Sequence, residues 1–269
     1  MNKHISLAVL LLTSVATAAP VESGNSQVVP FPSAFPKPAN PIPKAENNFD
    51  HKQEQFFIHI PASYTGREPF GLIVFVDAGN SRNALPAGWE TVLEQKKLLF
   101  IAPQNVGNDQ NSKRRYGLSV AAALAMKRHY NIDRSKVYIA GVSGGARIAG
   151  ALGFYAPDIF KGTIQSCGAD FYKPVPKVAV TDAVTAAHPT AYGNLIAANP
   201  TQVAAARARV KFVFITGPGD YRHPFMLDIY NGGFKPERFQ ALFLDIEGMG
   251  HAICGAPALE SALDFLSKP

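Results

Sequence analysis

Short apolar segments alternate with segments of helical spacing from about residue 55 to the C-terminus. The apolar segments are 55–60, 72–76, 98–102, 137–140, 162–166, 210–216 and 241–246. Runs of this length without polar alternation are typical of strands buried on both faces. The intervening patterns predict helices at 88–95, 117–130, 145–155, 201–209, 226–232 and 257–266. This alternation predicts an α/β fold with a mainly parallel sheet covered by helices on both faces.

The segment from Gly141 to Gly145 reads GVSGG and joins a predicted strand directly to a predicted helix. A G-x-S-x-G turn in this setting places a serine on a strained strand-to-helix turn with its hydroxyl above the sheet. Side chains two positions to either side of that serine would collide with the neighbouring strand and helix. The pattern therefore predicts Ser143 as a nucleophile.

A serine nucleophile needs a histidine base and a carboxylate that orients the histidine, and both follow along the chain. Asp220 lies in the loop after the apolar run 210–216, and His251 follows the run 241–246 through a glycine-rich turn. Because parallel strands end at one edge of the sheet, these three residues are expected to lie together. Asp245 and Glu247 are alternative acids, but their positions inside the strand and on the path to His251 favour Asp220.

From about Gln55 onward the chain resembles the α/β-hydrolase superfamily, and within it the secreted polyhydroxybutyrate depolymerases and feruloyl esterases. The resemblance is carried by four segments: 130–133 (YNID), 155–160 (YAPDIF), 217–220 (GPGD) and 248–251 (GMGH). It implies a serine esterase that needs no cofactor and acts on an ester of bulky or polymeric type. A serine peptidase of the same fold and a catalytically silent binding module are the alternatives.

The loop after the strand 72–76 departs from the pattern of that group. Asp77-Ala78-Gly79 stands where the group usually has His-Gly. An oxyanion hole takes one backbone N–H from this loop and another from the residue after the nucleophile. We therefore expect Gly79 and Gly144 to be the two donors.

The N-terminus has the organisation of an export signal. Residues 1–19 combine a basic start, a short apolar core and a small-residue cleavage region, and no later stretch approaches the length of a membrane span. Residues 20–47 are rich in proline and are expected to be extended, which leaves 48–269 as the catalytic domain. After cleavage of the signal peptide, the protein is expected to be secreted or periplasmic, monomeric and not bound to a membrane.

Charge and motifs exclude several other classes of function. The net charge of +6 becomes +5 without residues 1–19, and its densest cluster, Lys113-Arg114-Arg115, is expected to be a solvated face. No aromatic residues interleave with it, so nucleic-acid binding is not expected. The sequence holds no H-E-x-x-H or paired C-x-x-C, and the usual nucleotide-binding signatures are missing.

Two further regions bear on the cleft. Residues 171–200 interrupt the strand and helix rhythm and are interpreted as a short cap. Tyr221, Arg222 and His223 follow the predicted acid and are candidates for lining the cleft, whereas Trp89 is expected in the core.

Cys167 and Cys254 are the only two cysteines. Both are expected to emerge at the active-site edge of the sheet, and an exported protein reaches an oxidising compartment. The prediction is a disulfide that fixes the loop of His251, with two free buried thiols as the alternative.

Overall fold

The computed structural model describes residues 21–30, 49–50, 53–176, 191–193 and 196–268. The predicted signal peptide and much of the proline-rich segment lie outside these residues. None of the helices in the described ranges is long and apolar enough to cross a membrane.

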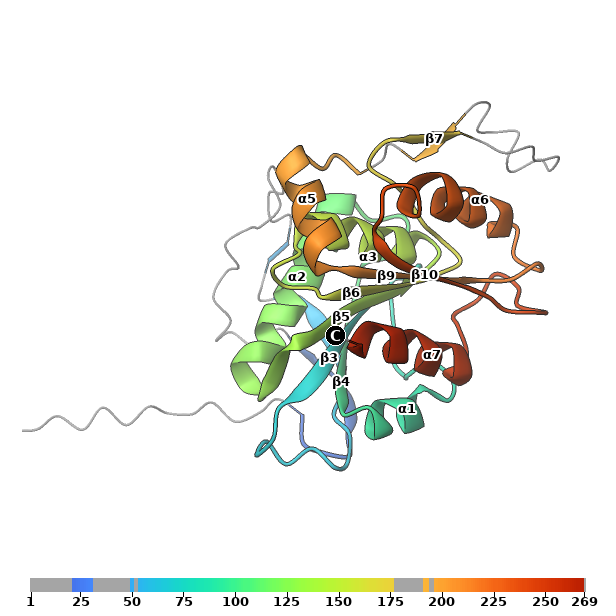
Figure 1. Ribbon diagram of the computed structural model, residues 1–269. Helices are drawn as coiled ribbons and strands as arrows, with labels where there is room; N and C mark the ends of the chain where they lie inside the picture. The colour runs from blue at the N-terminus through green and yellow to red at the C-terminus, as the bar shows by residue number, and fades with distance from the viewer. Residues whose placement is uncertain (1–20, 31–48, 51–52, 177–190, 194–195, 269) are drawn as a thin grey trace, which may run out of the picture.

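An eight-stranded sheet runs through the molecule in the order β1-β2-β4-β3-β5-β6-β9-β10 (Figure 1). Its strands are β1 (Ser26–Pro30), β2 (Gln55–His59), β3 (Phe70–Val76), β4 (Leu98–Pro103), β5 (Ile132–Val142), β6 (Gly162–Ser166), β9 (Lys211–Thr216) and β10 (Gln240–Asp245). The pairs from β4 through β10 are parallel, and β1 and β2 add an antiparallel edge. The mainly parallel sheet predicted from the apolar runs is confirmed.

Helices cover both faces of this sheet (Figure 1). They are α1 (Trp89–Gln95), α2 (Ser112–His129), α3 (Gly144–Tyr155), α5 (Pro200–Arg209), α6 (His223–Asp228), the π-helix η1 (Ile229–Phe234) and α7 (Ala256–Ser267). Helices α2, α3 and α5 lie on one face, and α1 and α7 lie on the other. Helix α7 packs through Leu259, Ala262, Leu263 and Leu266, whose three- and four-residue spacing forms one apolar stripe.

Helix α2 begins five residues earlier than the sequence pattern predicts. The side chain of Asn111 accepts a hydrogen bond from the backbone N–H of Lys113 at 2.8 Å, which caps the first turn at Ser112. Arg115 therefore lies within a helix rather than on a loop. This shift changes the environment of the whole basic cluster.

The structured domain begins before residue 48, so the predicted boundary is corrected. Strand β1 pairs antiparallel with β2, and Val21 is 3% exposed. The backbone N–H of Val21 donates to the hydroxyl of Tyr130 at 3.0 Å, and that hydroxyl donates to the carbonyl of Val21. Residues 21–30 thus belong to the sheet because their apolar positions and backbone groups find partners there.

The expected cap region contains a small two-stranded sheet of β7 (Pro174–Pro176) and β8 (Ala191–Gly193). Residues 177–190 and 194–195, which complete this region, lie outside the described residues. Trp89 is 1% exposed on the α7 side of the sheet, as predicted for a core residue.

Candidate active site

Ser143 lies on the turn between β5 and α3 with φ 54° and ψ −119°. A positive φ at a residue with a side chain is strained, and the strain persists only where the surroundings fix the turn. A Cβ atom on Gly141 would collide with the backbone of Gly145, and one on Gly145 would collide with the carbonyl oxygen of Val76. The glycines around Ser143 are therefore required by the close approach of α3 to β3 and β5.

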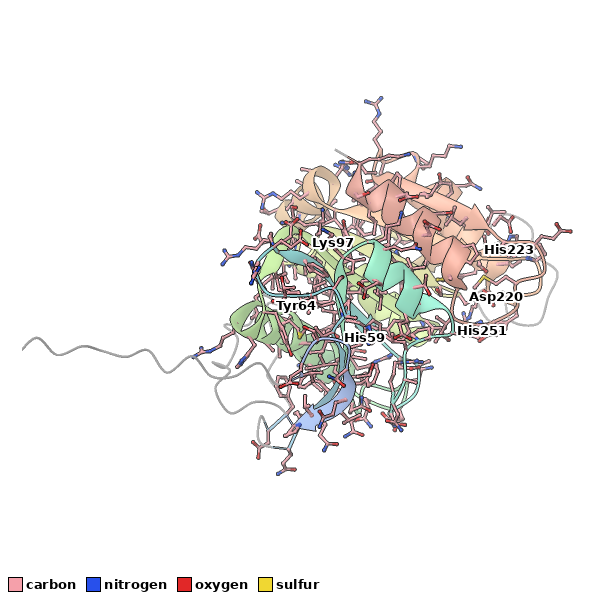
Figure 2. All side chains as sticks on the ribbon, turned by 90° about the horizontal axis from the view of Figure 1, so that it is seen from below. His59, Tyr64, Lys97, Asp220, His223 and His251 are labelled. Atoms are coloured by element: carbon pink, nitrogen blue, oxygen red, sulfur yellow. The ribbon has the colours of Figure 1, made fainter. Side chains whose placement is uncertain are left out.

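Asp220 and His251 meet at the ends of β9 and β10. An isolated parallel bridge joins Gly219 to Gly250 and holds the two loops side by side. Nδ1 of His251 lies 2.7 Å from Oδ1 of Asp220, and both residues are at the same edge of the molecule in Figure 2. A hydrogen bond from Nδ1–H to a carboxylate leaves Nε2 of the imidazole free to accept a proton.

The carboxylate of Asp220 is fully buried, so its charge depends on its hydrogen bonds. Burial alone would raise its pKa. The backbone N–H of Arg222 at 3.0 Å, the hydroxyl of Thr216 at 2.7 Å and His251 outweigh burial and hold the pKa of Asp220 below its ordinary value. Asp220 is therefore a stable anion beside the imidazole.

Asp245, one of the two alternative acids, has a different partner. Its Oδ2 atom lies 3.0 Å from Nε2 of His223, away from Nδ1 of His251. Of the three candidate acids, it is Asp220 that the structure brings to His251.

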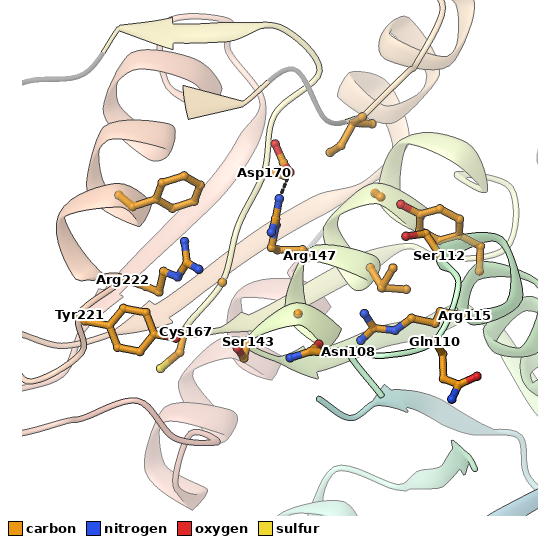
Figure 3. Close-up of a pocket in the computed structure, with 17 residues that line it drawn as sticks. Asn108, Gln110, Ser112, Arg115, Ser143, Arg147, Cys167, Asp170, Tyr221 and Arg222 are labelled. Atoms are coloured by element: carbon orange, nitrogen blue, oxygen red, sulfur yellow. Dashed lines mark hydrogen bonds and ion pairs between the residues drawn. The ribbon is translucent and has the colours of Figure 1, made fainter. Parts of the chain in front are cut away.

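A pocket of about 510 Å³ opens beside Ser143 and Gly144. Figure 3 shows that its lining side chains come from the loop before α2, from α2 and α3, and from the loops after β6 and β9. Tyr221 and Arg222 line it, as expected for the residues that follow Asp220. His223 contacts Asp245 instead.

Tyr221 and Cys167 connect the pocket to His251. The ring of Tyr221 stacks on the imidazole with centroids 4.4 Å apart, and its hydroxyl lies 3.4 Å from Nε2. Cys167 lines the pocket together with Ser143, and its sulfur lies within 4.8 Å of the polar atoms of Asp220 and His251. Tyr221 and Cys167 thus lie near His251 and also line the pocket beside Ser143. Among the described residues, Nε2 of His251 faces the hydroxyl of Tyr221, and no hydrogen bond joins His251 to Ser143.

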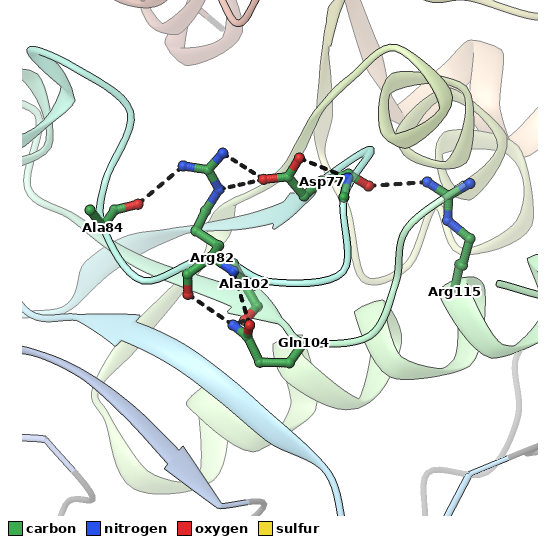
Figure 4. Close-up of polar contacts among 7 residues, drawn as sticks. Asp77, Arg82, Ala84, Ala102, Gln104 and Arg115 are labelled. Carbon is green, nitrogen blue, oxygen red and sulfur yellow. Dashed lines mark hydrogen bonds and ion pairs between the residues drawn. The ribbon is translucent and has the colours of Figure 1, made fainter. Parts of the chain in front are cut away.

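The loop after β3 is organised by Asp77 (Figure 4). Its carboxylate accepts from Nε of Arg82 at 2.7 Å and from the backbone N–H of Gly79 at 3.1 Å. The N–H of Gly79 is therefore already engaged, and Gly79 does not line the pocket. The expectation that Gly79 donates to an oxyanion is corrected, because the Asp77 carboxylate takes its donor.

Asn108 occupies the position beside the other expected donor. A Cβ atom on Gly144 would collide with the side-chain amide of Asn108, so the amide packs directly against Gly144. Asn108 is held there by its backbone N–H, which donates to the carbonyl of Ala78 at 2.9 Å. The side chain lies next to Ser143 in Figure 3. No local pattern in the sequence distinguishes this asparagine.

The predicted disulfide is not formed, and both thiols are free and buried. Cys167 adopts φ 55°, and its thiol donates to the carbonyl of Ala252 at 3.2 Å, toward the loop of His251. Cys254 instead packs in the core with Trp89, whose indole N–H donates to the carbonyl of Cys254. The two residues lie near the same sheet edge, but the side chain of Cys167 faces the loop of His251 and that of Cys254 lies in the core.

Cys167, Asp220 and His251 form a cluster of possible metal ligands within the described part of the chain. The acid and the imidazole already bond to each other, and burial raises the pKa of the Cys167 thiol to about 12. Metals bind the thiolate rather than the thiol. The cluster therefore fits a hydrogen-bonded network better than a metal site.

The basic cluster 113–115 does not form a single solvated face. Arg114 pairs with the buried Glu54, with 2.7 Å between Nη2 and Oε2. Arg115 is 5% exposed and lines the pocket, where Arg147 from α3 and Arg222 also lie. Sequence reasoning missed Arg115 and Arg147. The capping asparagine at 111 was the one available signal, since it moves Arg115 into a helix.

Comparisons with known proteins give structural neighbours only. No protein-family model matches the sequence, and a search of curated proteins finds no match. A ferulic acid esterase is 16% identical with a TM-score of 0.61, covering 91% of this chain and 98% of its own. An S-formylglutathione hydrolase from Staphylococcus aureus is 14% identical with a TM-score of 0.59, covering 90% and 97%.

An acetyl xylan esterase from Aspergillus awamori is 16% identical with a TM-score of 0.55, covering 90% of this chain and all of its own. Together with the parallel sheet, its two helical layers and the serine turn between β5 and α3, these likenesses confirm the predicted fold. The chain has the α/β-hydrolase fold.

Proposed function

We propose that the protein is a serine hydrolase that cleaves carboxylic esters through an acyl-enzyme. The observation that carries the proposal is the 2.7 Å contact between His251 and the buried Asp220, at the sheet edge where Ser143 stands on its strained turn. A hydrogen-bonded acid and imidazole near a half-buried serine on a strained turn is the arrangement that activates a hydroxyl.

In the first step Oγ of Ser143 attacks the ester carbonyl while Nε2 of His251 takes the hydroxyl proton. Asp220 keeps the imidazole in the tautomer with hydrogen on Nδ1 and stabilises the imidazolium that forms. His251 then gives the proton to the departing alkoxide. Water repeats the sequence on the acyl-enzyme and releases the acid.

The charge on the tetrahedral oxygen requires donors at the turn. The backbone N–H of Gly144 is one, at the start of α3. With the N–H of Gly79 engaged by Asp77, we assign the second donor to the Nδ2–H of Asn108, whose Oδ1 packs against Gly144. Oxyanion holes use side-chain amide donors as well as backbone N–H donors.

Bulky or polymer-borne esters are the proposed substrates, and the secreted or periplasmic space is the proposed location. Two neighbours are named as a ferulic acid esterase and an acetyl xylan esterase, which supports testing aryl and acetyl esters of polysaccharides. The segment 1–19 supports export. Mass spectrometry of protein from the exported fraction tests whether residues 1–19 are removed on export. An intact Met1 would contradict this proposal.

Labelling with a fluorophosphonate and turnover of 4-nitrophenyl butyrate test the central proposal. We expect one label per chain at Ser143 and loss of at least about 10³-fold in kcat for Ser143→Ala. A folded protein that neither labels nor hydrolyses the ester would be a binding module instead. A protein that is labelled by the fluorophosphonate and hydrolyses amides but not esters would be a serine peptidase.

A further inference from the structure

We propose that the pocket beside Ser143 is built for esters that carry a carboxylate, and that the guanidinium of Arg115 anchors that carboxylate. The inference deepens the proposed function and rests on it for the reaction, but the binding of the anion is a separate property. It comes from the arrangement of charge around the pocket.

Arg115 is a buried cation whose Nε–H has no hydrogen-bond partner among the described residues. The residue is 5% exposed, and a guanidinium carries five N–H donors. Nη2 donates to the backbone carbonyl of Asp77 at 3.1 Å, whereas the buried Nε has no hydrogen-bond partner in the described part of the chain. A buried charge without a partner is costly, so its retention indicates a ligand that supplies the missing acceptor.

The neighbouring acids do not provide that acceptor. The carboxylate of Asp77 is committed to Arg82, and the carboxylate of Asp109 accepts from Asn80 at 2.9 Å. Within the described ranges, no carboxylate lies within the 4.0 Å ion-pair distance of Arg115. Figure 3 shows the Arg115 guanidinium directed toward Asn108 and Ser143.

Charge in the rest of the pocket is also unbalanced. Arg147 pairs with Asp170 at 3.0 Å, and Asp170 is the one acidic residue in the described lining. Arg222 lies over the rings of Tyr221 and Phe225, at 5.3 and 5.7 Å from their centroids. The lining therefore holds three arginines and one carboxylate. Burial, with a smaller effect of the nearby Arg147 charge, lowers the pKa of Arg115, which an anion in the pocket would reverse.

A carboxylate on the substrate fits these observations better than an uncharged chain. Its two oxygens match the paired N–H donors of a guanidinium. Charge-assisted hydrogen bonds of this kind are stronger than hydrogen bonds between neutral groups. The volume of about 510 Å³ has room for the part of the ester that carries the carboxylate, and the rest of a bulky ester would lie outside the pocket. The carboxylate can belong to the acyl part or to the alcohol part of the ester.

Matched ester pairs test the proposal and separate those two sources. On the acyl side, monomethyl glutarate is compared with dimethyl glutarate. On the alcohol side, 3-acetoxypropanoate is compared with 3-acetoxypropanamide. In at least one pair we expect kcat/KM of the anionic member to exceed that of the neutral member by about tenfold or more, the range for a charge-assisted hydrogen bond.

Arg115→Gln should reduce that anionic-to-neutral ratio by about tenfold or more. Lys113→Gln is the matched control, since it removes the same charge from an exposed position in the same turn of α2. It should leave the ratio unchanged. If Arg115→Gln fails to fold, raising the ionic strength of the wild-type assay should narrow the preference.

Binding to the Ser143→Ala variant separates this inference from the proposed reaction. Isothermal titration should give monomethyl glutarate or 3-acetoxypropanoate an affinity about tenfold above its neutral partner. If the esters are hydrolysed with an anionic-to-neutral ratio of kcat/KM near one, and Arg115→Gln does not change that ratio, Arg115 does not anchor a carboxylate. The proposed esterase activity would still stand. If the anionic esters bind more tightly than the neutral ones but are not hydrolysed, the carboxylate anchor stands and the proposed esterase activity is wrong.

Discussion

Tyr221 covers His251 at the mouth of the pocket. Their rings stack at 4.4 Å with an angle of 28° between planes, and the tyrosine hydroxyl lies 3.4 Å from Nε2, the atom that accepts the serine proton in the proposed reaction. Tyr221 is 46% exposed, so the stack is formed at the surface without burial of the tyrosine. The ring holds the imidazole, whereas the hydroxyl competes for its free nitrogen.

These two effects are separable by substitution. Tyr221→Phe keeps the stack and removes the competing hydroxyl, so kcat should stay equal or rise about two- to threefold. Tyr221→Ala removes the stack and should lower kcat about tenfold, because misplacing a catalytic group by about 1 Å is costly. Steady-state kinetics on 4-nitrophenyl butyrate give both values. A large loss in Tyr221→Phe would show that the hydroxyl itself takes part.

The buried carboxylate of Asp220 predicts a pH-dependent contribution to stability. Its folded pKa lies below its ordinary value of about 3.9, so ionised Asp220 stabilises the fold above that pH. The contribution is lost as the pH falls through the folded pKa. Thermal unfolding of wild type and Asp220→Asn from pH 7 to pH 2 should show their difference shrinking below about pH 4. A difference that grows on acidification would reverse the assignment.

Asn108 is predicted to stabilise the oxyanion. Removing one oxyanion donor costs about 10²- to 10³-fold in kcat with little change in KM, because the donor acts on charge that appears in the transition state. Asn108→Ala should show this pattern, and Gly79→Ala should not, since the Gly79 N–H is engaged by Asp77. A rise in KM alone for Asn108→Ala would make it a ground-state contact.

The serine turn should tolerate no side chain at Gly145. Its Cβ would collide with the carbonyl oxygen of Val76, which is rigid backbone, whereas the nearest atom to a Cβ on Gly79 is 3.9 Å away. Overpacking of this kind costs about 1 to 3 kcal/mol, and a backbone collision lies at the upper end. Urea unfolding should therefore show Gly145→Ala destabilised by about 3 kcal/mol and Gly79→Ala by less than about 1 kcal/mol. Equal losses would contradict this packing.

Both cysteines should titrate as thiols. Burial raises the pKa of Cys167 to about 12 and that of Cys254 to about 11, so neither is a thiolate near neutral pH. Ellman's reagent should react slowly with the native protein and find two thiols in urea without reductant. A protein with no thiols in urea would contain the disulfide that the structure does not form.

Features that depend on contiguous residues could be predicted before the fold was known. The glycines around Ser143 and the flanking apolar runs specify a strand, a tight turn and a helix, because local sterics admit little else. Asp220 and His251 were predictable for a related reason. In a parallel sheet the carboxyl ends of strands share one edge, so residues just after two apolar runs must lie near each other.

Features that depend on distance and direction between separate elements became visible only in the folded chain. Strand β1 was not predictable, because its five residues gain their stability from pairing with β2 rather than from their own pattern. Cys167 and Cys254 lie near the same edge, yet the thiol of Cys167 donates to the carbonyl of Ala252 while Cys254 packs beside Trp89, and both thiols are free. A sequence pattern fixes which edge a residue reaches but not where its side chain points.

The same limit hid the charged lining of the pocket. Arg115, Arg147 and Arg222 are 32 to 107 positions apart along the chain, and only the packing of α2 and α3 against the sheet brings them to one cavity. Whether an arginine is solvated or buried depends on the surfaces that close over it. That closure is a property of the packed layers, because desolvation is set by everything that surrounds a charge and not by its neighbours in sequence.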